Sequence, residues 1–140
     1  MLALEAFGCS SLRRVRECER VIDAVNEGLG NLTPYTADAG ASPETYSKLA
    51  DAYDALGKDL EGASSTDPAL GKTFGAYREL IQRAAKQTRA FSEELAKATS
   101  TPEEETEKAA RLTRLRAQAK SEVSREASLV RKLNGLCHPQ

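Results

Sequence analysis

The sequence is poor in the residues from which catalytic and metal sites are usually built. It has no tryptophan and one histidine, His138, which lies next to Pro139. A single histidine excludes a di-iron bundle, because that site needs a Glu-x-x-His motif on each of two helices. A chain end also rarely gives a general base the fixed surroundings that it requires, and the serines and cysteines lack a base to activate them. We therefore expect no enzyme, no metal site and no cofactor.

Long apolar runs and an excess of one charge are absent as well. The sequence has no apolar run of about 18 residues, the length that a membrane-spanning helix needs. Its 20 basic and 21 acidic residues leave a net charge of −1, which argues against nucleic acid or an anionic membrane surface as a partner. The chain is instead rich in Ala, Leu, Glu, Lys and Arg, the composition of a helical protein.

Four segments carry apolar residues at alternating steps of three and four, the spacing of amphipathic helices. They cover residues 15–32, 46–63, 70–98 and 109–137. Such seams favour helices that pack nearly parallel to one another around a shared core. On the first segment the seam consists of Val15, Cys18, Ile22, Val25, Leu29 and Leu32. The positions that we expect to be deeply buried are Leu56, Phe74, Ile81, Val123 and Val130.

Three helix starts are marked by a capping residue followed by proline. The pairs are Ser42-Pro43, Asp67-Pro68 and Thr101-Pro102. The side chain of the first residue accepts a hydrogen bond from a free N–H of the first turn, and proline at the next position has no N–H to leave unpaired. We therefore predict that helices begin within two residues of these prolines.

The connections predict an all-α, antiparallel up-down-up-down four-helix bundle. Short connections at residues 63–67 and 99–101 force neighbouring helices to run antiparallel. The longer segments after them predict a long hairpin of the third and fourth helices. Gly28 and Gly30 weaken the end of the first helix, before a longer connection at residues 33–41. The alternative is a three-helix arrangement with a loosely attached first helix.

The expected domain organisation is a ragged N-terminal segment at residues 1–10 and a single helical bundle at residues 11–137. Charge is unevenly spread along the bundle: residues 38–67 are mainly acidic and residues 108–132 mainly basic. Two interpretations remain open. The basic face binds an acidic partner, or the acidic second helix attracts the basic third and fourth helices across the rim of the bundle.

Cys9 is a candidate lipidation site. It stands in the stretch AFGCSS, which looks like the cleavage and acylation site of a bacterial lipoprotein. Eight residues precede it, without Lys or Arg, and Glu5 occupies a place where a signal peptide needs an apolar stretch. Either the true start lies upstream of Met1, or Cys9 is an ordinary thiol. Contact with a membrane is expected only through this anchor.

Cys18 and Cys137 are predicted to form a disulfide. In an up-down-up-down bundle the first helix starts at the end where the fourth helix finishes, and the two cysteines lie on the seams at that end. Such a bond persists in an oxidising compartment rather than in most cytosols. The alternative is two buried thiols that behave as small apolar residues.

The two ends of the chain carry a resemblance to a known group of proteins. ECERVIDAVN at residues 17–26, paired with LVRKLNGLC at residues 129–137, resembles small helical envelope proteins of unknown function associated with myxobacteria. In these proteins a cysteine opens the first helix and another closes the last. The resemblance implies an exported, lipoprotein-like four-helix bundle, and it implies no activity.

Three functions follow as hypotheses. The first is a non-enzymatic interaction or structural module of the cell envelope or periplasm, with an unidentified protein partner. The second is a sensor that binds a small molecule in a pocket lined by Tyr46, Tyr53 and Tyr77, although tyrosines in a helical core often serve packing alone. The third is a cytoplasmic adaptor or chaperone that binds a partner helix in its groove.

Overall fold

The computed structural model describes residues 5–37, 42–63 and 65–138, and the side chains of residues 5–11 and 36–37 lie outside this description. The described part is helical, without a strand. The predicted all-α class is therefore confirmed.

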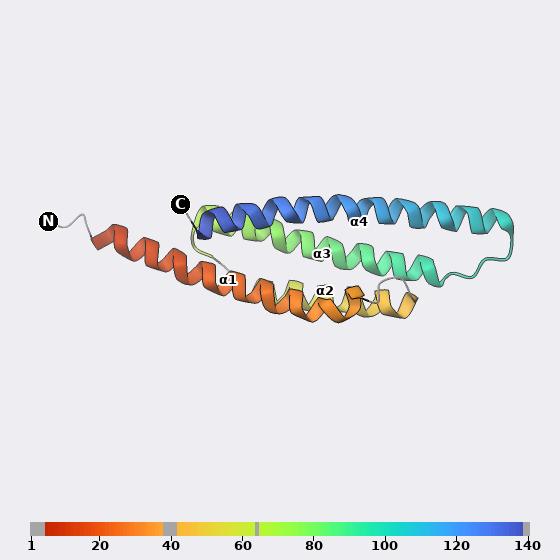
Figure 1. The fold of residues 1–140 in the computed structure, drawn as a ribbon, viewed down its shortest axis with the longest axis horizontal. Coiled ribbons are helices and arrows are strands. Elements are labelled where there is room, and N and C mark those ends of the chain that lie inside the picture. The colour runs from red at the N-terminus through yellow and green to blue at the C-terminus, as the bar shows by residue number, and fades with distance from the viewer. Residues whose placement is uncertain (1–4, 38–41, 64, 139–140) are drawn as a thin grey trace.

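Four antiparallel helices make up the bundle: α1 (Glu5–Ala37), α2 (Pro43–Glu61), α3 (Pro68–Ala96) and α4 (Pro102–Cys137). They run alternately in opposite directions along one long axis, in the predicted up-down-up-down order (Figure 1). Helices α3 and α4 form the expected hairpin, and the first turns of α1 project beyond the other helices at the end where α4 finishes (Figure 1). None of the described helices is long and apolar enough to cross a membrane.

The three proline-marked starts are confirmed, since α2, α3 and α4 begin at Pro43, Pro68 and Pro102. In each case the side chain before the proline accepts a hydrogen bond from the backbone N–H three residues further on, over 3.2, 2.9 and 3.2 Å. Local cap chemistry thus decides where these helices begin.

Helix α1 is longer at both ends than the sequence predicts. It begins at Glu5, inside the N-terminal segment that was expected to be ragged, and it continues through Pro34 to Ala37, into the connection that was expected at residues 33–41. With 33 residues it spans about 50 Å. Proline removes one backbone hydrogen bond from the helix, but Leu32 is buried and Tyr35 packs against the core on either side of it. Tertiary contact therefore holds the last turns of α1.

Gly28 lies at a tight contact between α1 and α2. A Cβ atom at this position would stand 2.0 Å from Cδ1 of the buried Leu56, whereas a Cβ at Gly30 would meet nothing within 4 Å. The two glycines, which look alike in the sequence, therefore have opposite roles. Of these two glycines, only Gly28 is required for the packing of α1 on α2.

We expect Gly28→Ala to lower the free energy of unfolding by about 1–3 kcal/mol, because it overpacks a filled core. Gly30→Ala on the same helix is the matched control and should raise that free energy by up to about 1 kcal/mol, through helix propensity alone. Urea denaturation of both variants measures the difference. Equal effects of the two substitutions would contradict the close packing of α1 on α2.

The core predictions are confirmed for Leu56, Phe74 and Ile81, which are nearly inaccessible to solvent. Val130 is only partly buried. The prediction for Val123 is wrong, since 64% of this residue is exposed. The cause is tertiary, because α4 packs along α3 and meets α1 only sparsely. No helix of the described chain covers the middle of the α4 seam.

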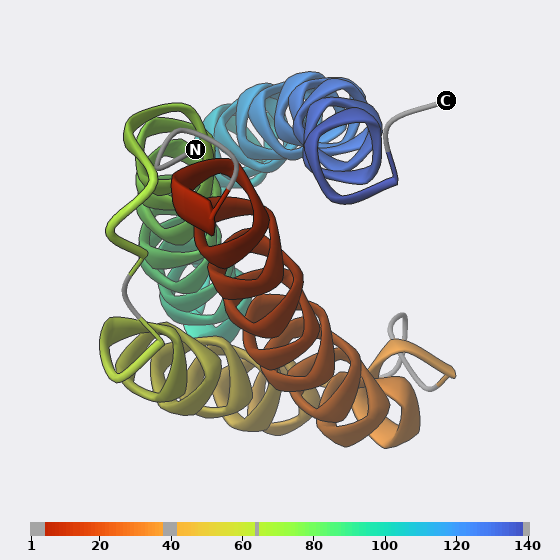
Figure 2. The same ribbon diagram turned by 90° about the vertical axis from the view of Figure 1, so that its left-hand side faces the viewer.

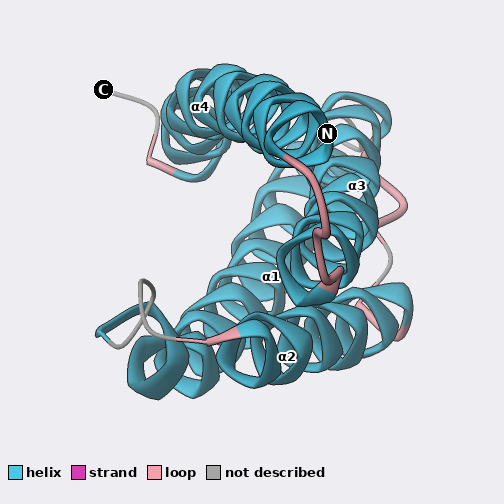
Figure 3. Ribbon diagram, turned by 90° about the vertical axis from the view of Figure 1, so that its right-hand side faces the viewer, coloured by secondary structure: helices cyan, strands magenta, loops and turns pink. Residues whose placement is uncertain are grey.

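The register of α1 also differs from the predicted seam. Val15 and Leu29 are exposed, and Val21 is buried in their place. The end views explain this shift, since the helices form an open arc rather than a closed square, in which α2 and α3 lie between neighbours while α1 and α4 meet only sparsely (Figures 2 and 3). Helix α1 lies against α2 and therefore turns a different face inward from that of a helix at the fourth corner of a closed bundle.

The predicted charge attraction holds between α2 and α3. The guanidinium group of Arg89 on α3 bonds Asp51 and Asp54 on α2, over 3.0 and 2.6 Å. On α4 the basic Arg111 instead pairs with Glu94 of α3 over 2.6 Å. Each of these ion pairs joins helices that are consecutive along the chain, so they support the pairing of neighbours.

Candidate functional site

The disulfide end of the bundle joins both terminal helices. Cys18 of α1 and Cys137, the last residue of α4, form a disulfide with their Cα atoms 5.6 Å apart, and 119 residues separate them in sequence. Cys18 lies well inside α1, yet the two meet because the first turns of α1 project past the end of α4 (Figure 1). Cys9 belongs to α1, and its side chain lies outside the described part of the structure.

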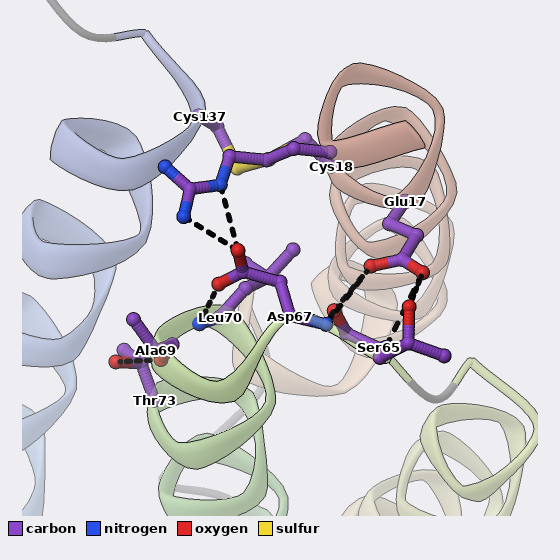
Figure 4. A network of polar contacts seen from close by, with 10 residues as sticks. Glu17, Cys18, Ser65, Asp67, Ala69, Leu70, Thr73 and Cys137 are labelled. Carbon is purple, nitrogen blue, oxygen red and sulfur yellow. Dashed lines mark hydrogen bonds and ion pairs between the residues drawn. A yellow bond between two sulfur atoms is a disulfide. The ribbon is translucent and has the colours of Figure 1, made fainter. Parts of the chain in front are cut away.

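Glu17, the neighbour of Cys18, anchors the connection between α2 and α3. Its carboxylate accepts hydrogen bonds from the hydroxyl groups of Ser65 and Thr66, the latter over 2.7 Å, and from the Thr66 N–H over 3.2 Å (Figure 4). The residue is 7% exposed. These bonds, led by that from Ser65, lower the pKa of the Glu17 carboxyl group to about 2.

Arg14, one helical turn before Glu17, binds the start of α3. Its Nε donates to the carboxylate of Asp67 over 2.9 Å, while Asp67 itself caps α3 through the Leu70 N–H. The bond from Leu70 and the guanidinium group of Arg14 together lower the pKa of the Asp67 carboxyl group. The sequence predicted the cap but not its partners on α1, because Arg14 and Glu17 resemble any other charged residues of an exposed helical face.

We expect Glu17→Gln to remove a pH-dependent part of the stability. The pKa of Glu17 in the folded state, about 2, lies below the ordinary value of 4.5, so the stabilisation is complete above pH 4.5 and is lost as the pH falls toward 2. The difference in Tm between wild type and Glu17→Gln should therefore be largest near neutral pH and shrink in acid. Glu19→Gln, at an exposed neighbouring position, is the control. A difference that stays constant from pH 7 to pH 2 would contradict this role of Glu17.

A cavity of about 230 Å³ lies between α2, α3 and α4, half open to solvent. Helix α1 contributes no lining residue among the described side chains. The apolar lining from α3 and α4 includes Leu80, Ile81, Ala84, Leu115, Ala119 and Val123. The exposure of Val123 is thus explained, because it faces a hollow that no other helix of the described chain fills.

The three tyrosines predicted as a pocket divide between this cavity and the core. Tyr46 and Tyr53 line the cavity, and the ring of Tyr46 meets Phe91 edge to face with 4.7 Å between the ring centroids. Tyr77 is completely buried and does not line the cavity. Its hydroxyl group donates to Glu126, a cavity residue, over 3.4 Å. Burial raises the pKa of both Tyr53 and Tyr77, so both phenols are neutral at pH 7.

Three charged side chains of α4 line the same cavity. Glu122 pairs with Arg83 of α3 over 3.4 Å, and Arg116 lies over the ring of Phe91, 5.4 Å from its centroid. The third, Glu126, has the Tyr77 hydroxyl as its hydrogen-bond donor. These residues were not predicted as site residues, because on α4 alone they look like ordinary polar positions of an amphipathic helix.

The cavity combines an apolar hollow with three charged side chains of α4. Among the described residues no group of three or more His, Cys, Asp or Glu side chains is placed to hold a metal ion. His138 is exposed and follows the last residue of α4, far along the chain from the cavity residues of that helix. The features that remain are an apolar hollow and its charged lining.

Comparison with known proteins places the chain in no family. No protein-family model matches the sequence, and no curated protein and no solved structure matches the chain.

Proposed function

We propose that the protein is a non-enzymatic helical binding module that holds a small apolar ligand between α2, α3 and α4. The observation that carries this proposal is the half-open apolar cavity on the uncovered side of the arc. Its volume of about 230 Å³ exceeds the roughly 150 Å³ of an engineered cavity that binds benzene, and it falls below the about 300–1,000 Å³ of pockets for drug-sized ligands. The size therefore favours a small molecule over a partner helix.

The module is proposed to work in an oxidising compartment such as the cell envelope or periplasm. The pairing of Cys18 with Cys137 supports this location, because disulfides rarely persist in cytosols. The resemblance of the two chain ends to exported helical proteins points the same way. A lipid anchor at Cys9 belongs to the same proposal. Intact mass of the protein isolated from its own host tests it, since acylation adds mass and a disulfide removes two hydrogens.

Binding is tested with 1-hexanol, a neutral apolar probe, on the full-length protein. Saturable ¹H–¹⁵N chemical-shift changes are expected at cavity residues such as Leu80, Ala84 and Leu115. Ala119→Phe should abolish these changes by filling the hollow. The matched control is Ala110→Phe, which changes an exposed alanine of the same helix outside the cavity lining and should leave binding intact.

Two results would overturn the binding proposal. One is the absence of saturable shifts at cavity residues in the wild-type protein. The other is binding that Ala119→Phe and Ala110→Phe weaken equally, which would place the probe elsewhere on the molecule.

A further inference from the structure

We propose that the ligand of this cavity is a small organic cation with an apolar body, such as an alkylammonium ion, and that Glu126 is its counter-ion. The inference rests on the proposed function and adds the charge of the ligand to it. It comes from the lining of the cavity, where a carboxylate lies beside apolar and aromatic side chains.

Glu126 is partly buried in the cavity wall, and no basic side chain of the described residues forms an ion pair with it. Its hydrogen-bond donor is a neutral phenol, the Tyr77 hydroxyl, over 3.4 Å. Tyr53, which lines the same cavity, feels the negative charge, because Glu126 contributes after burial to the raised pKa of this phenol. A carboxylate in an apolar surface is stabilised by a cation that shares its surroundings.

The other charges of the cavity already have partners. Glu122 forms ion pairs with Arg83 and Arg125, at 3.4 and 3.6 Å. Arg116 stacks over Phe91 and lies ten residues before Glu126 on α4, a separation of about 15 Å along the helix axis. Arg116 is the basic residue of the cavity lining, so an ammonium group at Glu126 lies far from the positive charge of the lining and close to its carboxylates.

The remaining lining suits the rest of such a ligand. Leu80 and Ile81 offer apolar surface to an alkyl chain. Tyr53 adds an aromatic ring, whose face attracts cations. A carboxylate ligand would instead meet the charge of Glu126, and a neutral ligand would leave that charge uncompensated. The lining thus distinguishes three ligand classes that have the same apolar body.

The test compares hexylammonium, 1-hexanol and hexanoate on the full-length protein, by ¹H–¹⁵N chemical-shift titration at pH 7. We expect hexylammonium to bind at least about tenfold more tightly than 1-hexanol, the size of a charged hydrogen bond, and hexanoate to bind most weakly. The ratio of the affinity for hexylammonium to that for 1-hexanol should fall as the NaCl concentration is raised, because salt screens a partly exposed ion pair. These measurements use the wild-type protein alone.

Substitutions at Glu126 test whether this residue causes the preference for hexylammonium over 1-hexanol. Glu126→Gln should bind hexylammonium and 1-hexanol about equally, whereas Glu126→Asp keeps the charge and should keep part of the preference. The matched control, Glu105→Gln, removes an exposed carboxylate at the other end of α4, outside the cavity lining, and should behave as wild type.

The outcomes separate this inference from the proposed function. Equal binding of all three probes at the cavity, or a preference for hexanoate, would overturn the cation while leaving a binding module. A preference that survives in Glu126→Gln would overturn the role of Glu126. The absence of any probe from the cavity would overturn the binding module itself.

Discussion

Replacing Cys18 and Cys137 together by alanine is expected to lower the free energy of unfolding by about 5 kcal/mol. The bond closes a loop of 119 residues, and cross-linking so long a loop removes much conformational entropy from the unfolded chain. It also joins α1 to α4, which otherwise share few contacts. Guanidinium denaturation of the oxidised protein and of the double variant measures the loss.

Two controls accompany this measurement. Cys9→Ser, at the third cysteine, should leave the oxidised protein as stable as wild type. Wild-type protein treated with a dithiol reductant should match the double variant. A loss below about 1 kcal/mol in the double variant would show that the bond adds little to the contacts of the folded chain.

Ile81→Ala is expected to cost about 2–5 kcal/mol. Ile81 is 1% exposed in the centre of α3, and its truncation leaves a void among Leu56 and other buried side chains. Val123→Ala is the matched comparison, because Val123 is 64% exposed and its truncation should change stability by less than about 0.5 kcal/mol.

Urea denaturation of both variants, compared with wild type, distinguishes the closed seam of α3 from the open seam of α4. Similar costs at the two positions would mean that another part of the molecule, or a second molecule, covers Val123 in solution. A small cost at Ile81 would contradict its central place in the core.

The helix starts and the pairing of the cysteines could be predicted from the sequence because each depends on little information. A cap needs only the residues around Pro43, Pro68 or Pro102, and its geometry is local. The cysteine pairing needs only the number of helices and their alternating direction. Both predictions tolerate errors of a few residues in the predicted length of a helix. The predicted bounds of α1 were wrong by several residues at both ends, and the cysteine pairing was still correct.

The closure of the bundle could not be predicted in the same way. The α4 seam has regular apolar spacing, so Val123 looks as buried as Ile81 in the sequence. Whether α1 covers that seam depends on how α1 divides its contacts between α2 and α4, and it packs mainly against α2. The cavity follows from this packing, and so does the place of Glu126 in its wall. Neither feature leaves a local pattern in the sequence.

The order of helix contacts has a consequence for the speed of folding. The extensive contacts of the bundle join helices that follow one another in the chain, α1 with α2, α2 with α3 and α3 with α4. Such a topology has a low contact order, and helical proteins of this kind fold in microseconds to milliseconds. Disulfide formation takes seconds or longer. We therefore expect the reduced chain to collapse hairpin by hairpin first, so that an already assembled arc brings Cys18 and Cys137 together for oxidation.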